Sequence, residues 1–173
     1  MKATDILILS DSHQHVSAID RVLEQSAPHM MIFCGDGLRD FSYRDLPCPL
    51  YAVKGNCDAF LHGVDEVDNE IILPVDGLRI FVTHGHRYDV KDGLEKLVAR
   101  AAAVKADVAI FGHTHVPLER FLPAGCPMET YGIHLEKPLY LFNPGSIGAM
   151  RPSFGTLTVR DGVPLFGHGT LSY

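Results

Sequence analysis

The chain has 173 residues, of which 46% are hydrophobic and 21% are charged, and its formal net charge is −6. This length and balance predict one globular domain, residues 1–173, with a substantial buried core. The acidic balance and the lack of any lysine or arginine block argue against binding of long nucleic acid, and no apolar run approaches the length of a membrane span.

The chain contains four cysteines, Cys34, Cys48, Cys57 and Cys126. None of them forms a C-x-x-C pair, and no secretory leader precedes them. Free thiols of this kind are typical of a reducing compartment, so the expected location is the cytoplasm.

The N-terminal part alternates short apolar runs with a helical pattern. Residues 5–9, 30–33 and 50–53 have the length and composition of strands that are buried on both faces. Between the first two runs, apolar residues recur at helical spacing over residues 16–27. This order predicts parallel strands with helices covering the sheet.

The next part begins with a predicted hairpin. Residues 70–75 and 78–83 flank Asp76-Gly77, a strong two-residue turn signal. An apolar stripe over residues 90–102 then predicts a helix, with Asp92 and Glu95 as its capping pair. Residues 108–111 form a further buried strand.

The C-terminal part is predicted to consist of short strands. The candidates are residues 116–122, 139–142, 156–159 and 163–166, and Asp161-Gly162 marks a second hairpin. Residues 123–138 are the least regular stretch and are expected to form a loop or a ragged hairpin.

Five predicted strands are each followed directly by a polar cluster. The clusters are Asp11-Ser12-His13, Gly35-Asp36, Gly55-Asn56-Cys57-Asp58, His84-Gly85-His86 and Gly112-His113-Thr114-His115. In open α/β sheets, sites are built where the carboxyl ends of the strands meet. His113 and His115 are two residues apart after an apolar run, so they are expected to project together from a strand end.

These clusters supply seven candidate metal ligands, namely Asp11, His13, Asp36, Asn56, His84, His113 and His115. Seven oxygen and nitrogen donors are too many for one tetrahedral site. They suit two adjacent divalent ions that share a carboxylate, either Asp36 or Asp11. Two ions roughly 3.5–4 Å apart favour in-line displacement at phosphorus. The glycines beside the ligands allow close backbone approach.

The order of these motifs resembles that of the calcineurin-like metallophosphoesterases. Their pattern is D-x-H, G-D, G-N-H-[DE], a histidine after a strand, and G-H-x-H, and it matches residues 11–115 in order. The later sequence Asn143-Pro144-Gly145-Ser146 resembles the small bacterial and archaeal phosphodiesterase branch of that family. The resemblance therefore covers most of the chain.

The resemblance implies an α/β fold, a four-layer αββα sandwich of two mixed β-sheets flanked by helices. It implies one metal held by Asp11, His13, Asp36 and His115, and a second held by Asp36, Asn56, His84 and His113. A metal-bridging hydroxide would attack the phosphorus of a small phosphate ester in line. Manganese is the expected ion, with iron, zinc, nickel and cobalt as alternatives.

One position departs from the family pattern. Cys57 stands where the family has the histidine proposed to assist the leaving group. A thiol is a poor general acid near neutral pH, so diesters or esters with good leaving groups are the expected substrates. Asn56, Cys57 and His86 are the candidate catalytic residues, with Asn56 also a ligand. Cys57 could instead be a soft metal ligand, a structural thiol or a neighbour of the ligands, and His86 could be an exposed loop histidine.

Other readings of the same residues stay open. Asp11 and Asp36 could cap helices, and Arg39, Arg87 and Arg151 could be phosphate clamps or ordinary surface charge. A non-catalytic protein-binding scaffold of the same fold, like a retromer subunit, is the rival function, and a short or cyclic nucleotide phosphodiesterase is a third. The oligomeric state is open, with a homodimer suggested by base rates alone.

Overall fold

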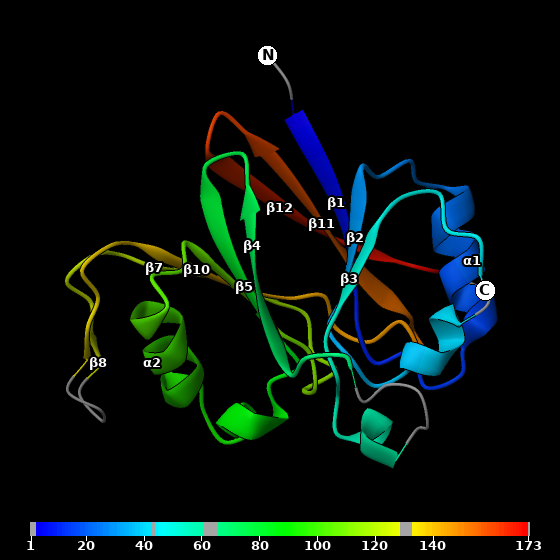
Figure 1. Ribbon diagram of the computed structural model, residues 1–173, viewed down its shortest axis with the longest axis horizontal. Helices are drawn as coiled ribbons and strands as arrows, with labels where there is room; N and C mark the ends of the chain where they lie inside the picture. Colours follow the sequence, from blue (N-terminus) through cyan, green and yellow to red (C-terminus); the bar gives the residue numbers. More distant parts are fainter. Residues whose placement is uncertain (1–2, 43, 61–65, 129–132, 173) are drawn as a thin grey trace.

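The computed structural model of the protein describes residues 3–42, 44–60, 66–128 and 133–172. Two five-stranded sheets face each other at its centre (Figure 1). Helices cover the outer face of each sheet, which confirms the predicted four-layer sandwich.

The first sheet has the strand order β12-β11-β1-β2-β3. Its strands are β1 (Ala3–Leu9), β2 (Met30–Phe33), β3 (Leu50–Ala52), β11 (Ser153–Arg160) and β12 (Val163–Thr170). β1, β2 and β3 run parallel, as predicted, whereas β11 and β12 are antiparallel to their neighbours. The sheet is therefore mixed. β3 is an edge strand in which Tyr51 is 40% exposed, so the expectation that residues 50–53 are buried on both faces was wrong.

The second sheet has the order β4-β5-β6-β10-β7. Its strands are β4 (Glu70–Val75), β5 (Leu78–Thr83), β6 (Val108–Ile110), β10 (Leu139–Asn143) and β7 (Leu118–Leu122). The central strands β5, β6 and β10 are parallel, and the outer strands β4 and β7 are antiparallel. A small pair, β8 (Pro127–Met128) and β9 (Ile133–His134), confirms the ragged hairpin.

Both predicted tight hairpins are present. Asp76 and Gly77 have φ angles of 44° and 86°, and Asp161 and Gly162 have 52° and 76°. Two successive positive φ angles are those of a type I′ turn, whose twist matches that of the strands it joins.

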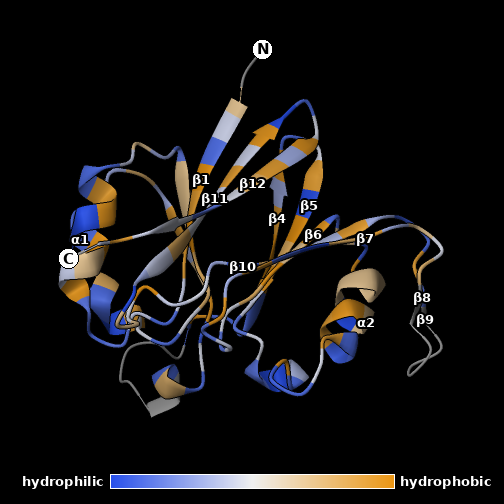
Figure 2. Ribbon diagram, turned by 180° about the vertical axis from the view of Figure 1, so that it is seen from behind, coloured by the Kyte–Doolittle hydropathy of each residue, from blue (hydrophilic) through white to orange (hydrophobic). Residues whose placement is uncertain are grey.

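Three hydrophobic clusters hold the four layers together. One lies between the sheets and contains Ile8, Ile80 and Phe142. A second joins the first sheet to α1 (Val16–Glu24) through Ile19, and the third joins the second sheet to α2 (Glu95–Ala103) through Leu97. Figure 2 shows the apolar stripes of both helices turned toward the sheets. This packing fixes the strand ends relative to one another.

The helix boundaries differ from the prediction at two places. α1 ends at Glu24, before Pro28, because a residue that precedes proline disfavours helical backbone. α2 begins only at Glu95, and its N-cap is Leu94 without any side-chain cap, so the capping pair was wrong. Asp89 has φ of 50°, which starts a separate turn and leaves Val90 buried outside the helix.

The remaining helical segments are single turns at the strand ends. They are η1 (Leu38–Phe41), η2 (Cys57–Phe60) and η3 (His86–Tyr88), all 3₁₀ helices. Together with the loops after β1, β2, β3 and β5 they gather at the lower edge of the molecule in Figure 1. Among the helices of the described residues, none is long and apolar enough to cross a membrane.

Candidate metal centre

The carboxyl ends of β1, β2, β3, β5 and β6 bring the five polar clusters together. The backbones of these loops approach closely, and glycine makes this possible. A Cβ on Gly35 would lie 2.5 Å from the amide nitrogen of Gly55, and a Cβ on Gly112 would lie 1.9 Å from Oγ of Ser10. Alanine at position 35 would therefore push two strand ends apart, and alanine at position 112 would displace the side chain of Ser10.

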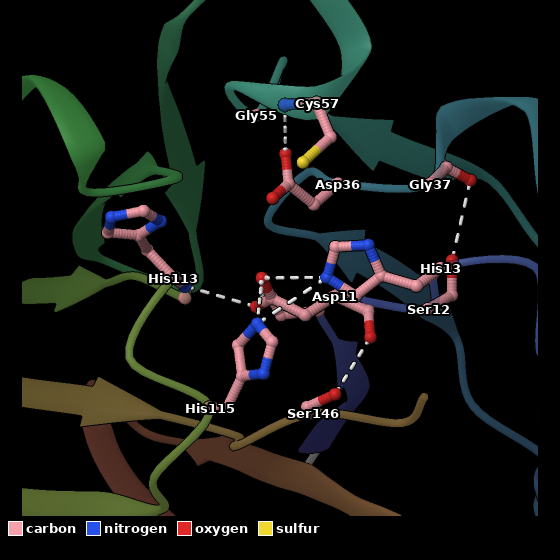
Figure 3. A network of polar contacts seen from close by, with 12 residues as sticks. Asp11, Ser12, His13, Asp36, Gly37, Gly55, Cys57, His113, His115 and Ser146 are labelled. Atoms are coloured by element: carbon pink, nitrogen blue, oxygen red, sulfur yellow. Dashed lines mark hydrogen bonds and ion pairs between the residues drawn. The ribbon is translucent and has the colours of Figure 1, made fainter. Parts of the chain in front are cut away.

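The first group of candidate ligands surrounds Asp11 (Figure 3). Oδ1 of Asp11 lies 3.1 Å from Nε2 of His115 and 3.9 Å from Nε2 of His13, and these two ring nitrogens are 3.4 Å apart. Oδ2 accepts hydrogen bonds from the hydroxyl of Ser10 and from the amide of His113. Asp11 is fully buried, so its carboxylate is fixed and aimed at the two imidazoles.

The second group surrounds the buried His84. Its Nδ1 lies 2.7 Å from the carbonyl oxygen of Cys34 and donates to it, which leaves the Nε2 lone pair for the site. This Nε2 lies 3.1 Å from Oδ1 of Asn56, 3.2 Å from Nδ1 of His113 and 3.4 Å from Oδ2 of Asp36. Holding one ring nitrogen with a backbone carbonyl is the usual way to orient a metal-binding histidine.

Asp36 stands between the two groups. Oδ1 accepts a hydrogen bond of 2.7 Å from the amide of Cys57 (Figure 3), while Oδ2 faces His84. Its donor atoms also come within 4.8 Å of those of His13. Burial would raise the pKa of Asp36, but the hydrogen bond and charge of His84 outweigh it and hold the pKa well below its usual range. The carboxylate is therefore ionised.

The arrangement of donors fits divalent cations. Oδ1 of Asp11 is buried, and its 3.1 Å contact with Nε2 of His115 takes the place of a hydrogen bond from a hydroxyl or backbone amide among the described residues. Burial and the charge of His84 lower the pKa of His113 to about 4, so its imidazole is neutral at pH 7. Imidazoles, carboxylates and an amide oxygen gathered in this way form a donor set for borderline metals.

His113 and His115 do not project together from a strand, so that expectation was wrong. β6 ends at Ile110, and both histidines lie in the following loop with φ angles of 67° and 61°. His113 turns toward His84, whereas His115 turns toward Asp11. The left-handed backbone thus distributes two neighbouring histidines to two different groups.

Left-handed backbone is concentrated at this site. Five residues of the clusters have positive φ angles without being glycine, and so does Gln14 directly after the first cluster; the five are Asp11, His13, Asp36, His113 and His115. Such conformations cost free energy and persist where the surroundings enforce them, often at functional sites. Neither Asp11 nor Asp36 caps a helix, because α1 is preceded by His15 and η1 by Gly37. The capping reading of the two aspartates was therefore wrong.

Asp58 organises two of the loops and was not among the candidate site residues. It is buried, and its carboxylate accepts hydrogen bonds from the amides of Asp36 (2.8 Å), Gly37 (3.0 Å), Leu38 (3.0 Å) and Gly55 (2.9 Å). The loop after β2 is thereby tied to the loop after β3. The position of Asp58 in the G-N-C-D motif was the only sequence signal for this role. The spacing of that motif does not reveal amide partners some 20 residues away.

The Asn143–Ser146 segment supports the Asp11 loop from below. Nδ2 of Asn143 donates to the carbonyl oxygen of Gly112, and the hydroxyl of Ser146 donates to that of Asp11 (Figure 3). The motif that suggested the phosphodiesterase branch thus acts on the backbone of two candidate ligand loops rather than on a ligand.

The remaining candidates lie at the rim. The ring of His86 is half-buried, 5.3 Å from the ring of His84 and 6.1 Å from that of His113. Cys57 is exposed beside Asp36. Of the arginines, Arg39 lines a cavity together with His13 and Asp36, whereas Arg87 lies in a different hollow with Glu70 and Arg100.

Divalent ions are expected to stabilise the fold. If a metal is held at 100 times its dissociation constant, it adds about 2.7 kcal/mol to the free energy of unfolding. For a chain of this size that corresponds to a rise in Tm of roughly 5–10 °C. Thermal unfolding with EDTA and after addition of manganese measures the shift. The variant Asp11→Asn should lose most of it, and an unshifted wild-type Tm would contradict the metal centre.

A family model and two curated relatives all identify the chain as similar to phosphoesterases. Residues 4–162 match the model of the calcineurin-like phosphoesterase superfamily domain. The probable metallophosphoesterase YsnB of Bacillus subtilis is 29% identical over 163 residues, covering 91% of this chain and 85% of YsnB. Phosphodiesterase YfcE of Escherichia coli is 29% identical over 185 residues, covering 88% of this chain and 86% of YfcE.

A solved structure supports the fold independently. The crystal structure of a conserved Streptococcus pneumoniae protein, described as a predicted phosphoesterase, superposes with a TM-score of 0.73. The match covers 98% of this chain and 91% of that chain at 23% identity. The two proteins therefore share the two-sheet architecture.

Proposed function

Because the chain belongs to the calcineurin-like phosphoesterase superfamily, we propose that it is a phosphodiesterase that uses two divalent metal ions. One observation carries the proposal: five separate strand ends bring seven donor residues together, and the buried carboxylates of Asp11 and Asp36 face the imidazoles of His115 and His84. Ordinary packing gives no reason to gather two buried carboxylates and several imidazoles at one place.

The donors divide between two ions as follows. Asp11, His13, Asp36 and His115 would hold the first, and Asp36, Asn56, His84 and His113 would hold the second. Two such ions would supply Lewis-acid polarisation of the phosphoryl group and would activate water as the nucleophile. Manganese is our first choice for both, since it accepts the mixed oxygen and nitrogen donors.

The protein's own residues position the ligands and stabilise the charge that develops on the substrate. Oδ2 of Asp36 faces His84, and Oδ1 is held by the amide of Cys57. Asn56 turns its Oδ1 toward His84, while its Nδ2 lies 3.3 Å from Sγ of Cys57. That amide nitrogen is the donor that we assign to a phosphoryl oxygen of the substrate, on which negative charge grows during attack. His86 borders the same space.

Cys57 limits the leaving groups that the proposed enzyme can expel. Burial and the carboxylates of Asp36 and Asp58 raise the pKa of its thiol to about 11. Such a thiol transfers a proton poorly near pH 7, so esters whose leaving groups depart without a proton are the favoured substrates. The preference for diesters is supported by the relative YfcE, which is named a phosphodiesterase.

Replacing Cys57 by histidine is expected to raise turnover of a monoester with a poor leaving group, such as phenyl phosphate, by about 10–100-fold. A positioned general acid typically contributes factors of about this size or larger. Turnover of a p-nitrophenyl ester, whose leaving group needs no proton, should change little. Steady-state kinetics on the two esters gives the comparison, and an unchanged phenyl phosphate rate would show that the missing acid is not limiting.

The proposed function is tested by hydrolysis of bis-p-nitrophenyl phosphate. Metal-stripped protein receives manganese, nickel, zinc or magnesium separately, beside p-nitrophenyl phosphate as the monoester. Restored diester cleavage that exceeds monoester cleavage supports the proposal. Stoichiometric metal binding without hydrolysis under any condition would favour the protein-binding scaffold instead.

The setting of the enzyme is also part of the proposal. All four cysteines are free thiols, which suits action in the reducing cytoplasm. The substrate is a small phosphate diester, short or cyclic nucleotides included, and a homodimer is the arrangement that we would test first.

A further inference from the structure

A cavity of about 500 Å³ opens beside the candidate metal centre, on the side of His13 and Cys57. Its lining starts at His13 and Asp36, passes Cys57 and reaches Gln14 and Arg39. This size is within the range of small-ligand sites, roughly 300–1,000 Å³. The cavity is therefore large enough for the part of a substrate that extends beyond the reacting phosphorus.

The departure at Cys57 helps to keep this space open. The family pattern has histidine here, and a cysteine side chain is several atoms smaller. Because Cys57 is exposed and lines the cavity, histidine at this position would extend into the passage between Asp36 and Arg39. Cysteine in place of the family's histidine thus removes a proton donor and also leaves room for one ester arm of a substrate.

The acidic groups of the lining are already engaged. Oδ2 of Asp40 accepts hydrogen bonds from the hydroxyl of Ser12 (2.6 Å) and from the amide of Gln14 (2.8 Å). Asp58 is saturated by its four amides, and Asp36 faces the candidate metal centre. None of these carboxylates forms an ion pair with the cation on the same wall among the described residues.

Arg39 is that cation. Its side chain is exposed, and its guanidinium has no hydrogen-bond or ion-pair partner within the part of the chain that the structure describes. Its backbone belongs to η1, whose preceding amides are fixed by Asp58. It is the third residue after Asp36, so their Cα atoms are at most about 11 Å apart. A guanidinium matches the two oxygens of a phosphate or carboxylate.

We propose that Arg39, assisted by the side chain of Gln14, binds a second anionic group carried by one ester arm of the substrate. The inference rests on the proposed phosphodiesterase function and narrows its substrate class. The preferred substrates are diesters in which one arm carries a terminal phosphate or carboxylate. The reacting diester lies at the metal centre, and the charged arm extends past Cys57 to Arg39.

The test uses three p-nitrophenyl phosphodiesters with the manganese-loaded protein. Their second arms are propyl, 2-carboxyethyl and 2-phosphoethyl, so the series separates carboxylate from phosphate. We expect wild type to have a lower KM for at least one charged diester than for the propyl diester. Arg39→Gln should raise that KM by about 10–100-fold, the effect of one charge-assisted hydrogen-bond pair, while the KM of the propyl diester rises less than threefold.

Two controls make the outcome specific. Arg120→Gln removes the same charge from the edge strand β7, where Arg120 is exposed, and should leave all three KM values unchanged. Arg39→Lys keeps the charge without the planar fork and should recover part of the affinity. Equal KM values of wild type for charged and neutral diesters, or equal losses for all three in Arg39→Gln, would overturn the inference.

A binding measurement separates this inference from the proposed function. A non-hydrolysable phosphonate analogue of the phosphoethyl diester is titrated calorimetrically into wild type and Arg39→Gln. If none of the diesters is hydrolysed, the proposed function fails, but a 10-fold or greater loss of affinity in Arg39→Gln still supports the anion subsite. Equal affinity of the two proteins rejects the subsite whether or not hydrolysis occurs.

Discussion

Asp36→Asn is expected to reduce diester hydrolysis by about three orders of magnitude while the fold remains intact. The asparagine carbonyl oxygen can keep the hydrogen bond that the amide of Cys57 donates to Oδ1. The lost charge, however, faces His84 through Oδ2 and serves both ligand groups. Removing one preorganised charge from a transition state costs about 100–1,000-fold, and loss of a shared ligand adds weaker metal binding.

The measurement is kcat/KM for bis-p-nitrophenyl phosphate, determined over a wide range of manganese concentrations. Excess metal should restore only a small part of the activity, because a saturated site still lacks the shared charge. Asp45→Asn removes one carboxylate from an exposed position and should behave like wild type. An Asp36→Asn enzyme with more than a tenth of the wild-type activity would show that the two groups do not depend on a shared carboxylate.

The layers of the fold were predictable because the sequence pattern is local and strong. Buried runs such as residues 30–33 are apolar at every position, which is required of a parallel strand covered on both sides. The two Asp-Gly pairs selected type I′ turns because both residues of such a turn have positive φ. The α2 boundary was missed because Asp89 adopts a left-handed conformation that no periodicity signals.

The meeting of the polar clusters was predictable for a geometric reason. The carboxyl ends of parallel strands lie along one edge of a sheet, so polar residues after several such strands converge. The orientation of each side chain was not predictable, because it depends on loop backbone. His113 and His115 illustrate this: alternation along a strand would place them on one side, but left-handed φ angles direct them to different groups.

The donor groups of the site lie close enough together for a cation to bind between them. Oδ1 of Asp11 lies 3.1 Å from Nε2 of His115, and two pairs of imidazole nitrogens lie 3.2 Å and 3.4 Å apart. Burial would lower the pKa of His84, but Asp36 and Asp11 raise it, so a proton and a cation would compete for its Nε2. The scaffold must hold these groups in place, which is the role that we assign to Asp58.

Asp58→Asn is accordingly expected to be strongly destabilising even without metal. Each carboxylate oxygen of Asp58 accepts two backbone amides, Oδ1 those of Gly37 and Leu38 and Oδ2 those of Asp36 and Gly55. Asparagine keeps one acceptor and turns an NH₂ group toward two buried donors. Leaving two buried donors unsatisfied costs about 2–6 kcal/mol, or roughly 5–20 °C in Tm.

Urea unfolding in the presence of EDTA measures this loss separately from metal binding, and Asp45→Asn is the exposed control with an expected change below about 0.5 kcal/mol. Metal titration of the folded variant should also show affinity reduced by about 10–100-fold, as for other residues that orient ligands. A variant with the urea midpoint and the metal affinity of wild type would mean that the amides of the two loops find other acceptors. Asp36 and Asn56 would then be held by the packing of their strands alone, and the preorganisation of the site would not depend on the carboxylate of Asp58.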